Sequence, residues 1–283
     1  MMDSFMNSIN EILQSAFSLE DWVILRPERG LRKECYIAKN KMLNVFVKFD
    51  VPVENLKRLG EIAVSPKLLS SGVLNGTPYI IQEYVNGQHP DRLWLRANIP
   101  LVAQVVNRYH KDPQLGMQLK KSLSVDYAAC LNADLENLEH RFLKLSKEKT
   151  LDKEVTRGFN RLVKSVATFQ NTTVVPVHGE PNFNNMLLSP DKLFFIDWDE
   201  ITLSDPIRDI GPLIWWYFPE TCWATFFNHY GEQLTNDIIG KVYWFAARTS
   251  LDVAMWHVEN KKTDRGFFKD FVTAIRKRAN PQI

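Results

Sequence analysis

The sequence predicts an α+β protein with two lobes: a small antiparallel β-sheet lobe over residues 1–86 and a larger helical lobe over residues 87–283. Up to residue 86, short runs of β-branched and aromatic residues alternate with turn residues, which is typical of strands. From residue 87 on, apolar residues recur mostly at three- and four-residue spacing, which is typical of helices. A chain of 283 residues is long enough for two lobes with separate cores. We expect the hinge between them near residues 84–90.

Each element of the first lobe follows from local pattern. A short helix is expected near residues 4–17, and residues 22–25, 34–38 and 44–49 are expected to form an antiparallel meander. A helix over residues 53–62 should turn Leu56 and Leu59 inward. Two further strands, over residues 67–69 and 78–84, are joined by the turn at Asn75-Gly76.

The second lobe is predicted to be helical on both sides of one hairpin near residues 177–199. Helical spacing of apolar residues predicts helices over residues 101–110, 126–145, 153–169, 207–217, 222–230, 235–260 and 265–278.

Composition excludes several classes of partner. A net charge of +2 gives no electrostatic case for nucleic acid. The most apolar run, residues 211–218, is far shorter than the about 20 residues that span a bilayer, so no membrane partner is expected. The three cysteines are widely separated and predict neither a zinc site nor a disulfide framework. Because the start also lacks the pattern of a signal peptide, we expect a reducing, cytoplasmic location.

The most informative segment is His178-Gly-Glu-Pro-Asn-Phe-Asn-Asn185, followed by an apolar strand that ends at Asp197. Its spacing matches the kinase catalytic-loop pattern H-x-D-x-x-x-x-N, except that Glu180 stands where Asp is expected. Phosphoryl transfer needs one group to orient the attacking hydroxyl and two oxygen ligands for Mg²⁺ bound with ATP. We therefore predict Glu180 as the catalytic residue and Asn185 and Asp197 as metal ligands. The alternative for Asn185 is an ordinary turn residue, and the alternative for Asp197 is a capping or turn aspartate.

Lys48 is the candidate for contact with the nucleotide phosphates. Because side chains alternate along a strand, Lys48 and Phe46 share one face, and the other face carries Val45, Val47 and Phe49. The alternative is a lysine on a solvated edge strand. We favour Glu54 as its acidic partner, with Glu61 as the other choice, although the helix dipole alone also favours an acid in a first turn.

Two more segments are candidates for nucleotide binding. The backbone of Glu83 and Val85, in the extended segment before the lobe change, is expected to supply the acceptor and donor for an adenine ring. The loop of residues 26–33 is expected to lie over the phosphates, but it has only Gly30, which a plain hairpin turn also explains.

Residues around the motif are expected to support it. His178 should order the loop rather than move protons. Asp205 is a predicted helix N-cap, and Asp209 is predicted to brace the catalytic loop through backbone amides. Tryptophans at helical spacing in the C-terminal region predict core, but any that line a cleft would suit the ring face of a sugar or a cationic amine. They are Trp215, Trp216, Trp223, Trp244 and Trp256.

Together these residues resemble the aminoglycoside phosphotransferase/choline kinase-like family, whose fold is that of the protein kinases. The resemblance covers roughly residues 20–220 and is most specific from His178 to Asp209. It implies a bilobal protein-kinase-like fold and ATP- and Mg²⁺-dependent phosphorylation of a hydroxyl on a small molecule of the sugar, amino alcohol or aminoglycoside type, with Glu180 at the base position. Only seven residues separate Asp197 from Asp205-Pro206 and no A-P-E follows, so a protein substrate is disfavoured.

The rival hypothesis is a pseudokinase that binds nucleotide without transferring phosphate. It rests on Glu180, because glutamate is one methylene longer than aspartate. Pro181 restricts the backbone at Glu180 and is a candidate adjustment. The active enzyme is favoured because the sequence has the other residues that the kinase pattern requires, namely Lys48, Asn185 and Asp197. The sequence leaves the acceptor and the oligomeric state open.

Overall fold

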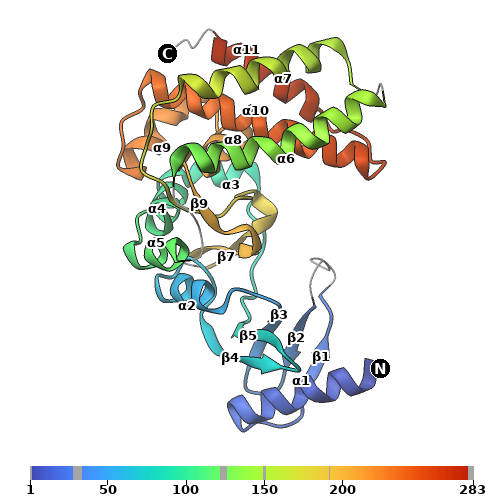
Figure 1. Cartoon of the computed structure of the whole chain (residues 1–283). Coiled ribbons are helices and arrows are strands. Elements are labelled where there is room, and N and C mark those ends of the chain that lie inside the picture. Colours follow the sequence, from blue (N-terminus) through green and yellow to red (C-terminus); the bar gives the residue numbers. More distant parts are fainter. Residues whose placement is uncertain (1, 28–33, 122–125, 149–150, 191, 280–283) are drawn as a thin grey trace. The chain divides into compact units, whose positions relative to one another are not determined.

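The computed structural model describes residues 2–27, 34–121, 126–148, 151–190 and 192–279. They form two compact units (Figure 1), of which the first comprises Met1–His89 with Met186–Asp199 and the second Pro90–Asn185 with Glu200–Ile283. The α+β class is confirmed: the first unit carries an antiparallel sheet and the second is mostly helical. The units do not follow a single cut in the sequence, because the hairpin of residues 186–199 belongs to the first. The hinge near residues 84–90 stays a prediction.

The first unit is built on a five-stranded antiparallel sheet in the order β1-β2-β3-β5-β4. The predicted meander and the hairpin at Asn75-Gly76 are both present, and helix α2 (Val53–Glu61) joins β3 to β4. The strands are β1 (Val23–Leu25), β2 (Cys35–Lys39), β3 (Asn44–Phe49), β4 (Leu68–Leu74) and β5 (Thr77–Glu83).

One face of this sheet is covered by helix α1 (Met2–Phe17), which packs Ile9 and Leu13 against it. Val45, Val47 and Phe49 point into the same core because side chains alternate along β3. The alternation turns Lys48 to the opposite face, as predicted. β3 pairs with a strand on each side, so the solvated-edge alternative for Lys48 is wrong.

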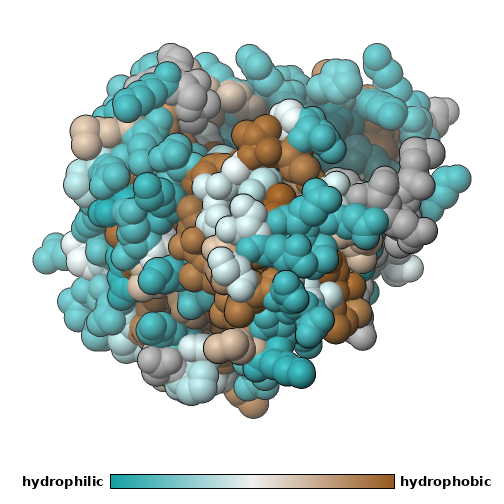
Figure 2. All heavy atoms as spheres, turned by 90° about the horizontal axis from the view of Figure 1, so that it is seen from below, coloured by the Kyte–Doolittle hydropathy of each residue, from teal (hydrophilic) through white to brown (hydrophobic). Residues whose placement is uncertain are grey.

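The surface of the molecule seen from below mixes apolar and hydrophilic side chains (Figure 2). Large apolar side chains exposed on the first unit are Val23, Leu25, Met42 and Val73. Single exposed apolar residues of this kind are ordinary on soluble proteins.

The predicted motif hairpin consists of β7 (Met186–Ser189) and β8 (Lys192–Phe195), with Met186 paired to Phe195. The Phe195 N–H donates to the Val64 carbonyl at 2.8 Å, which ties the hairpin to the segment after α2. The chain also passes close to β7 at Gly87, where a Cβ would lie 2.2 Å from the Leu188 carbonyl oxygen. Only glycine fits at that crossing.

The second unit is organised around α10 (Asn236–Glu259), which packs against α6, α7, α8 and α11. The helices around it are α3 (Arg92–Ala97), α4 (Ile99–His110), α5 (Pro113–Lys120), α6 (Tyr127–Lys147), α7 (Lys153–Ser165), α8 (Ile207–Tyr217), α9 (Trp223–Tyr230) and α11 (Phe267–Ala279). Two short strands, β6 (Val175–Val177) and β9 (Thr202–Ser204), pair antiparallel. Helices α3 and α5 and this strand pair were not predicted, because each is too short for its period to stand out in the sequence.

No helix within the described residues is both long enough and apolar enough to cross a membrane.

A buried ion pair joins α10 to the start of α8. Lys241 lies 2.9 Å from the Asp205 carboxylate, and both side chains are at most 2% exposed. Tyr127 of α6 donates its hydroxyl to the same carboxylate at 2.7 Å. Three segments of the second unit therefore meet at Asp205.

Substituting Lys241 with methionine should destabilise the protein by about 3–5 kcal/mol, because Asp205 would keep a buried charge without its cation. The expected fall in Tm is roughly 6–20 °C by thermal denaturation. Lys164→Met, at an exposed position of α7, is the matched control. Equal melting of the two variants would contradict the prediction.

Candidate active site

Strand β3 and the end of the motif hairpin bring together residues 149 positions apart in the first unit. Lys48 Nζ lies 2.8 Å from Asp197 Oδ1 and 3.0 Å from Asp199 Oδ1. The Lys48 side chain is 15% exposed, whereas that of Asp197 is 52% exposed. Lys48, predicted to contact phosphate, and Asp197, predicted to bind metal, therefore lie in one cluster. Asp199 is its third member.

The charges of this cluster stabilise one another. Burial by itself lowers the pKa of Lys48, but the hydrogen bond and charge of Asp197, together with Asp199, outweigh it and raise the pKa. Lys48 is thus held as an ammonium ion. The predicted metal ligand Asp197 therefore has a lysine as an ion-pair partner.

Asp197 also has an unusual backbone conformation, with φ at +65°. Non-glycine residues seldom adopt this left-handed region, although Asp and Asn do so more readily than others. Such residues concentrate at functional sites, where the surrounding structure enforces them.

The predicted acidic partner on α2 is not found. Lys48 pairs with the two aspartates rather than with Glu54, which is exposed in the first turn of α2. Glu61 instead pairs with Arg58 at 3.2 Å. The physical reason is that the helix dipole accounts for an acid in a first turn without any lysine.

At the end of β5, the Glu83 backbone faces β4, because its N–H donates to the Lys67 carbonyl at 2.9 Å. N–H and C=O of one residue point to the same side of a strand, so the Glu83 carbonyl also faces this side. The Glu83 N–H is thus already engaged in a hydrogen bond within the protein. The Val85 carbonyl accepts the Gly87 N–H at 2.9 Å, and adenine binding by this segment stays a prediction.

The catalytic-loop segment of the second unit is closed by its own hydrogen bonds. The Glu180 carbonyl accepts from Asn182 N–H at 2.8 Å and from Asn185 Nδ2 at 3.0 Å. Only the NH₂ of an amide donates to a carbonyl, so the Asn185 oxygen points away from the loop backbone. The Glu180 side chain is exposed. The structure thus brings Glu180 and Asn185 together.

Asp209 braces this loop, as predicted. Its carboxylate is fully buried and accepts the backbone N–H of His178 at 2.7 Å and of Gly179 at 2.9 Å. Burial would raise the pKa of Asp209, but the hydrogen bond and charge of His110 and the His178 amide lower it below its ordinary value. The brace is therefore an ionised carboxylate.

His178 orders the loop rather than facing solvent. It is fully buried, and its Nδ1 accepts the Glu180 N–H at 3.3 Å. Gly179, between them, has φ at +91°, and a Cβ there would lie 3.1 Å from the Glu200 carbonyl oxygen.

Asp205 is not the N-cap of α8, which is Pro206. Its carboxylate accepts the Ile207 N–H at 2.8 Å from one position earlier, while its other oxygen binds Lys241. The predicted contact of Asp205 with a backbone amide at the start of α8 is therefore present. The contact with Lys241, which lies 36 residues away in the sequence, was not predicted.

The remaining predicted features divide between the two units. Lys48, Asp197 and Asp199 lie in the first unit, whereas Glu180 and Asn185 lie in the second. Gly30 and most of its loop lie outside the described residues. Groups of three His, Cys, Asp or Glu side chains able to hold a metal do not occur in the described part of the chain.

Four of the five C-terminal tryptophans divide into core and pocket, whereas Trp256 is half-buried, with Lys262 Nζ 4.2 Å from the centre of its ring. Trp244 is fully buried and donates its Nε1 to the Leu162 carbonyl at 2.9 Å, as core residues do. Three others line a cavity of about 360 Å³ in the second unit, which we call the tryptophan pocket. Its lining consists of Trp215, Trp216, Trp223, Phe218, Pro219, Arg92, Glu220 and Asp270.

This tryptophan pocket is connected to the catalytic loop through Tyr217. The Tyr217 hydroxyl accepts the Phe183 N–H at 3.3 Å, and the two rings meet edge to face. On the pocket side, the Arg92 guanidinium lies 6.0 Å from the centre of the Tyr217 ring. Tyr217 therefore contacts both the loop, at Phe183, and the pocket lining, at Arg92.

Sequence reasoning missed several residues of this region. Tyr109, His110 and Tyr217 gave no signal, because each lies in a helix whose apolar period they simply continue. Asp270 also escaped notice, since an acid in a first helical turn is common.

Solved structures place the fold among the kinases. Choline kinase LicA from Streptococcus pneumoniae superposes with a TM-score of 0.66 and 16% identity, over 98% of this chain and 99% of that one. Choline kinase from Cryptosporidium parvum gives 0.69 and 12%, over 97% and 95%. A spectinomycin phosphotransferase, solved with ADP and spectinomycin, gives 0.65 and 14%, over 96% and 98%. At these identities the likeness establishes a kinase-like fold.

The family is established by sequence. The model of the phosphotransferase enzyme family matches residues 53–245, and the chain belongs to this family. Protein LicA of Haemophilus influenzae is 49% identical over 39 residues, a stretch that covers 14% of this chain and 15% of that protein. The predicted family, which consists of phosphotransferase enzymes, and the predicted fold class are confirmed.

Proposed function

We propose that this protein transfers a phosphoryl group from ATP, with Mg²⁺, to the hydroxyl of a small cationic alcohol. The observation that carries the proposal is the pairing of Lys48 with Asp197 and Asp199. The two aspartates directly follow the hairpin of β7 and β8, and the catalytic loop braced by Asp209 directly precedes this hairpin in the chain. These are the parts that phosphoryl transfer requires.

Asn185 and Asp197 fit a magnesium site by chemistry and by chain position. Both offer oxygen, the ligand that Mg²⁺ prefers, and phosphate oxygens of a nucleotide usually complete its shell. Asn185 is bonded to Met186, and Asp197 follows two residues after Phe195, the strand partner of Met186. When bound, the ion would neutralise charge on the transferred phosphoryl group.

Within this proposal the chain's own residues have separate tasks. Lys48 binds nucleotide phosphate as a fixed cation, and the backbone of Glu83 and Val85 binds adenine. Glu180 accepts the proton of the attacking hydroxyl. The Asp209 brace holds the backbone on which Glu180 is carried.

The tryptophan pocket supports a cationic acceptor. Indole faces attract ammonium groups, and each such contact is worth about 0.5–2 kcal/mol. Burial raises the pKa of Asp270 above its ordinary value, so a bound cation would stabilise its ionised form. The pocket has two carboxylates against one guanidinium, and one of them, Glu220, pairs with Lys277. Several neighbours are choline or ethanolamine kinases, which agrees with this class.

The test is ADP release by the purified protein with ATP and Mg²⁺ over a panel of choline, ethanolamine, neutral sugars and aminoglycosides. We expect turnover with the cationic alcohols. Turnover confined to sugars would contradict the acceptor class but keep the phosphotransferase.

Asp270→Asn should raise KM for the cationic alcohol about tenfold, the effect of about 1.4 kcal/mol of lost attraction, with kcat nearly unchanged. Glu139→Gln, an exposed acid on α6, removes the same charge outside the pocket and should leave KM unaltered. An unchanged KM in Asp270→Asn would exclude this carboxylate from acceptor recognition.

A further inference from the structure

We propose that His89 is a positioning residue for phosphoryl transfer, because its side chain fixes the end of the β7–β8 hairpin next to the metal ligand Asn185. The inference rests on the proposed function, since it takes Asn185 as a ligand of Mg²⁺. His89 lies far from the catalytic-loop motif in the sequence and directly precedes Pro90. His89 and the hairpin both belong to the first unit.

The outer edge of β7 is paired with the segment that follows β5. The Gln88 N–H donates to the Leu188 carbonyl at 3.2 Å, and the Leu188 N–H donates to the Gln88 carbonyl at 2.8 Å. This exchange of two bonds makes one hydrogen-bonded pair of an antiparallel ladder. The next such pair would join the residues two positions further along each segment, which are Pro90 and Met186.

Proline interrupts this ladder. Pro90 has no N–H, so it cannot donate to the Met186 carbonyl. The Nδ1 atom of His89 instead lies 2.8 Å from that carbonyl oxygen. A carbonyl only accepts, so Nδ1 carries the proton. The His89 side chain thus takes the place of the missing main-chain donor.

The Met186 carbonyl needs this donor, because Met186 is fully buried. A buried carbonyl that loses its hydrogen bond is unfavourable, and the backbone would shift toward another donor or toward water. Asn185 is bonded to Met186, so such a shift would move the amide oxygen that is proposed to bind Mg²⁺. A side chain outside the motif therefore controls the place of a ligand within it.

The other end of the hairpin is fixed by separate bonds. Phe195 donates its N–H to the segment after α2, and its carbonyl accepts from Trp198 Nε1 at 2.9 Å. These bonds flank Asp197, the second proposed ligand. Loss of the His89 donor should therefore displace Asn185 and leave Asp197 in place.

The experiment restores the missing amide. His89→Leu removes the donor but keeps a side chain of similar size, and the Mg²⁺ concentration for half-maximal ADP release should rise about three- to tenfold. His89→Asn keeps an N–H donor near the position of Nδ1 and should stay within about twofold of wild type. The double variant His89→Leu/Pro90→Ala regains a main-chain N–H, and its Mg²⁺ requirement should return to within about twofold of that of Pro90→Ala alone.

Two measurements separate this inference from the proposed function, because neither needs turnover. Amide hydrogen-exchange protection of Gln88 and Leu188 should fall in His89→Leu and recover when Pro90→Ala is added. By calorimetry, Mg²⁺ should strengthen ATP binding less in His89→Leu than in the wild-type protein. Both results in a protein that transfers no phosphate would contradict the proposed function and support the role of His89 in holding the metal ligand.

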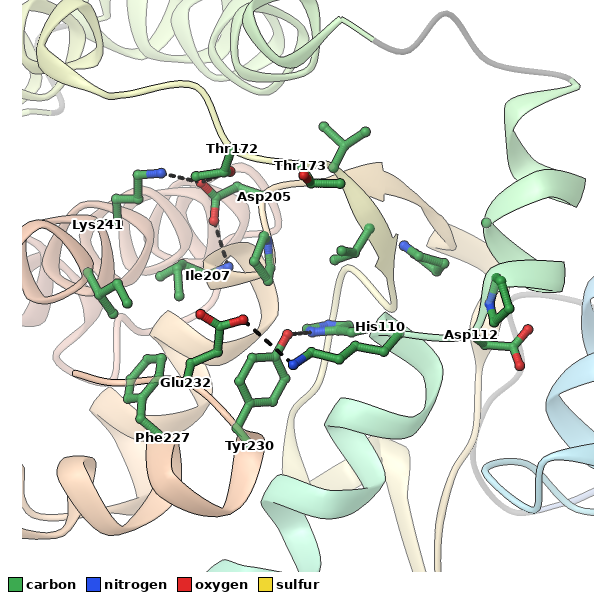
Figure 3. A pocket seen from close by; sticks show the side chains of 18 of the residues that line it. His110, Asp112, Thr172, Thr173, Asp205, Ile207, Phe227, Tyr230, Glu232 and Lys241 are labelled. Carbon is green, nitrogen blue, oxygen red and sulfur yellow. Dashed lines mark hydrogen bonds and ion pairs between the residues drawn. The ribbon is translucent and has the colours of Figure 1, made fainter. Parts of the chain in front are cut away.

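The matched controls remove one interaction or one side chain elsewhere. Glu232→Gln breaks an ion pair in which Lys111 Nζ lies 3.6 Å from Glu232 Oε1, beside a cavity of about 720 Å³ in the second unit (Figure 3). His140→Ala removes an exposed histidine of α6. Neither change should alter the Mg²⁺ requirement or the protection of the Gln88 amide.

Three outcomes would overturn the inference. The first is an unchanged Mg²⁺ requirement in His89→Leu. The second is an equal loss in His89→Leu and His89→Asn, because the donor would then not be the cause. The third is a double variant that recovers neither its Mg²⁺ requirement nor its exchange protection, because a main-chain amide at position 90 should replace the imidazole.

Discussion

Asp197→Asn is expected to lower kcat by about three orders of magnitude, the effect of removing several kcal/mol of charge stabilisation at a metal-assisted step. Asparagine keeps an oxygen of similar position and tolerates the left-handed backbone at φ +65°, so the fold should survive. Lys48 would lose one of its two carboxylate partners, and its pKa should fall toward its ordinary value.

Steady-state ADP release at saturating ATP and Mg²⁺ checks this expectation, with circular dichroism as the test of folding. Asp21→Asn is the matched control, because Asp21 is exposed and also has positive φ, at 58°. It should leave kcat and Tm nearly unchanged. Turnover at the wild-type rate in Asp197→Asn would show that Asp197 is not a metal ligand.

Glu180→Gln is expected to reduce kcat by about 10²- to 10⁴-fold with small changes in KM, because an amide cannot accept the hydroxyl proton. Glu180→Asp keeps the base but withdraws it by one methylene, and a misplacement of about 1 Å can cost about 100-fold. The aspartate variant should therefore retain at least as much activity as the glutamine variant.

This pair of variants separates the enzyme from the pseudokinase. A wild-type protein that binds ATP by calorimetry but transfers no phosphate would favour the pseudokinase, and gain of transfer in Glu180→Asp would identify the extra methylene as its cause. The control is Asn184→Ala, at an exposed loop position inside the motif segment, because its side chain has no task in the proposed chemistry. We expect its kcat to be near normal.

Local pattern was sufficient for most of the regular structure. Strand β3 and helix α8 have the predicted limits, since β-branched alternation and a sharp Pro206 boundary are strong local signals. Helices α3 and α5 escaped because six and eight residues contain too few turns to reveal a period. Pairing of β6 with β9 depends on contact between distant segments, which no local pattern contains.

The candidate site divides in the same way. His178, Gly179 and Glu180 are recognisable because backbone geometry requires their spacing within one loop. Asp209 was recognised as a brace because it belongs to the same motif. His110, by contrast, reaches Asp209 only because the second unit folds α4 against the start of α8, a distance of 99 residues in sequence.

The sequence by itself determined the fold class, the family and the order of the catalytic parts, because these depend on short-range periodicity and on motif spacing. Tertiary structure alone decided which charges meet. It pairs Lys48 with Asp197 and Asp199 instead of Glu54, Lys241 with Asp205, and His110 with Asp209. The reason is that ion-pair energy depends on distance and burial, and both arise only when separate elements pack together.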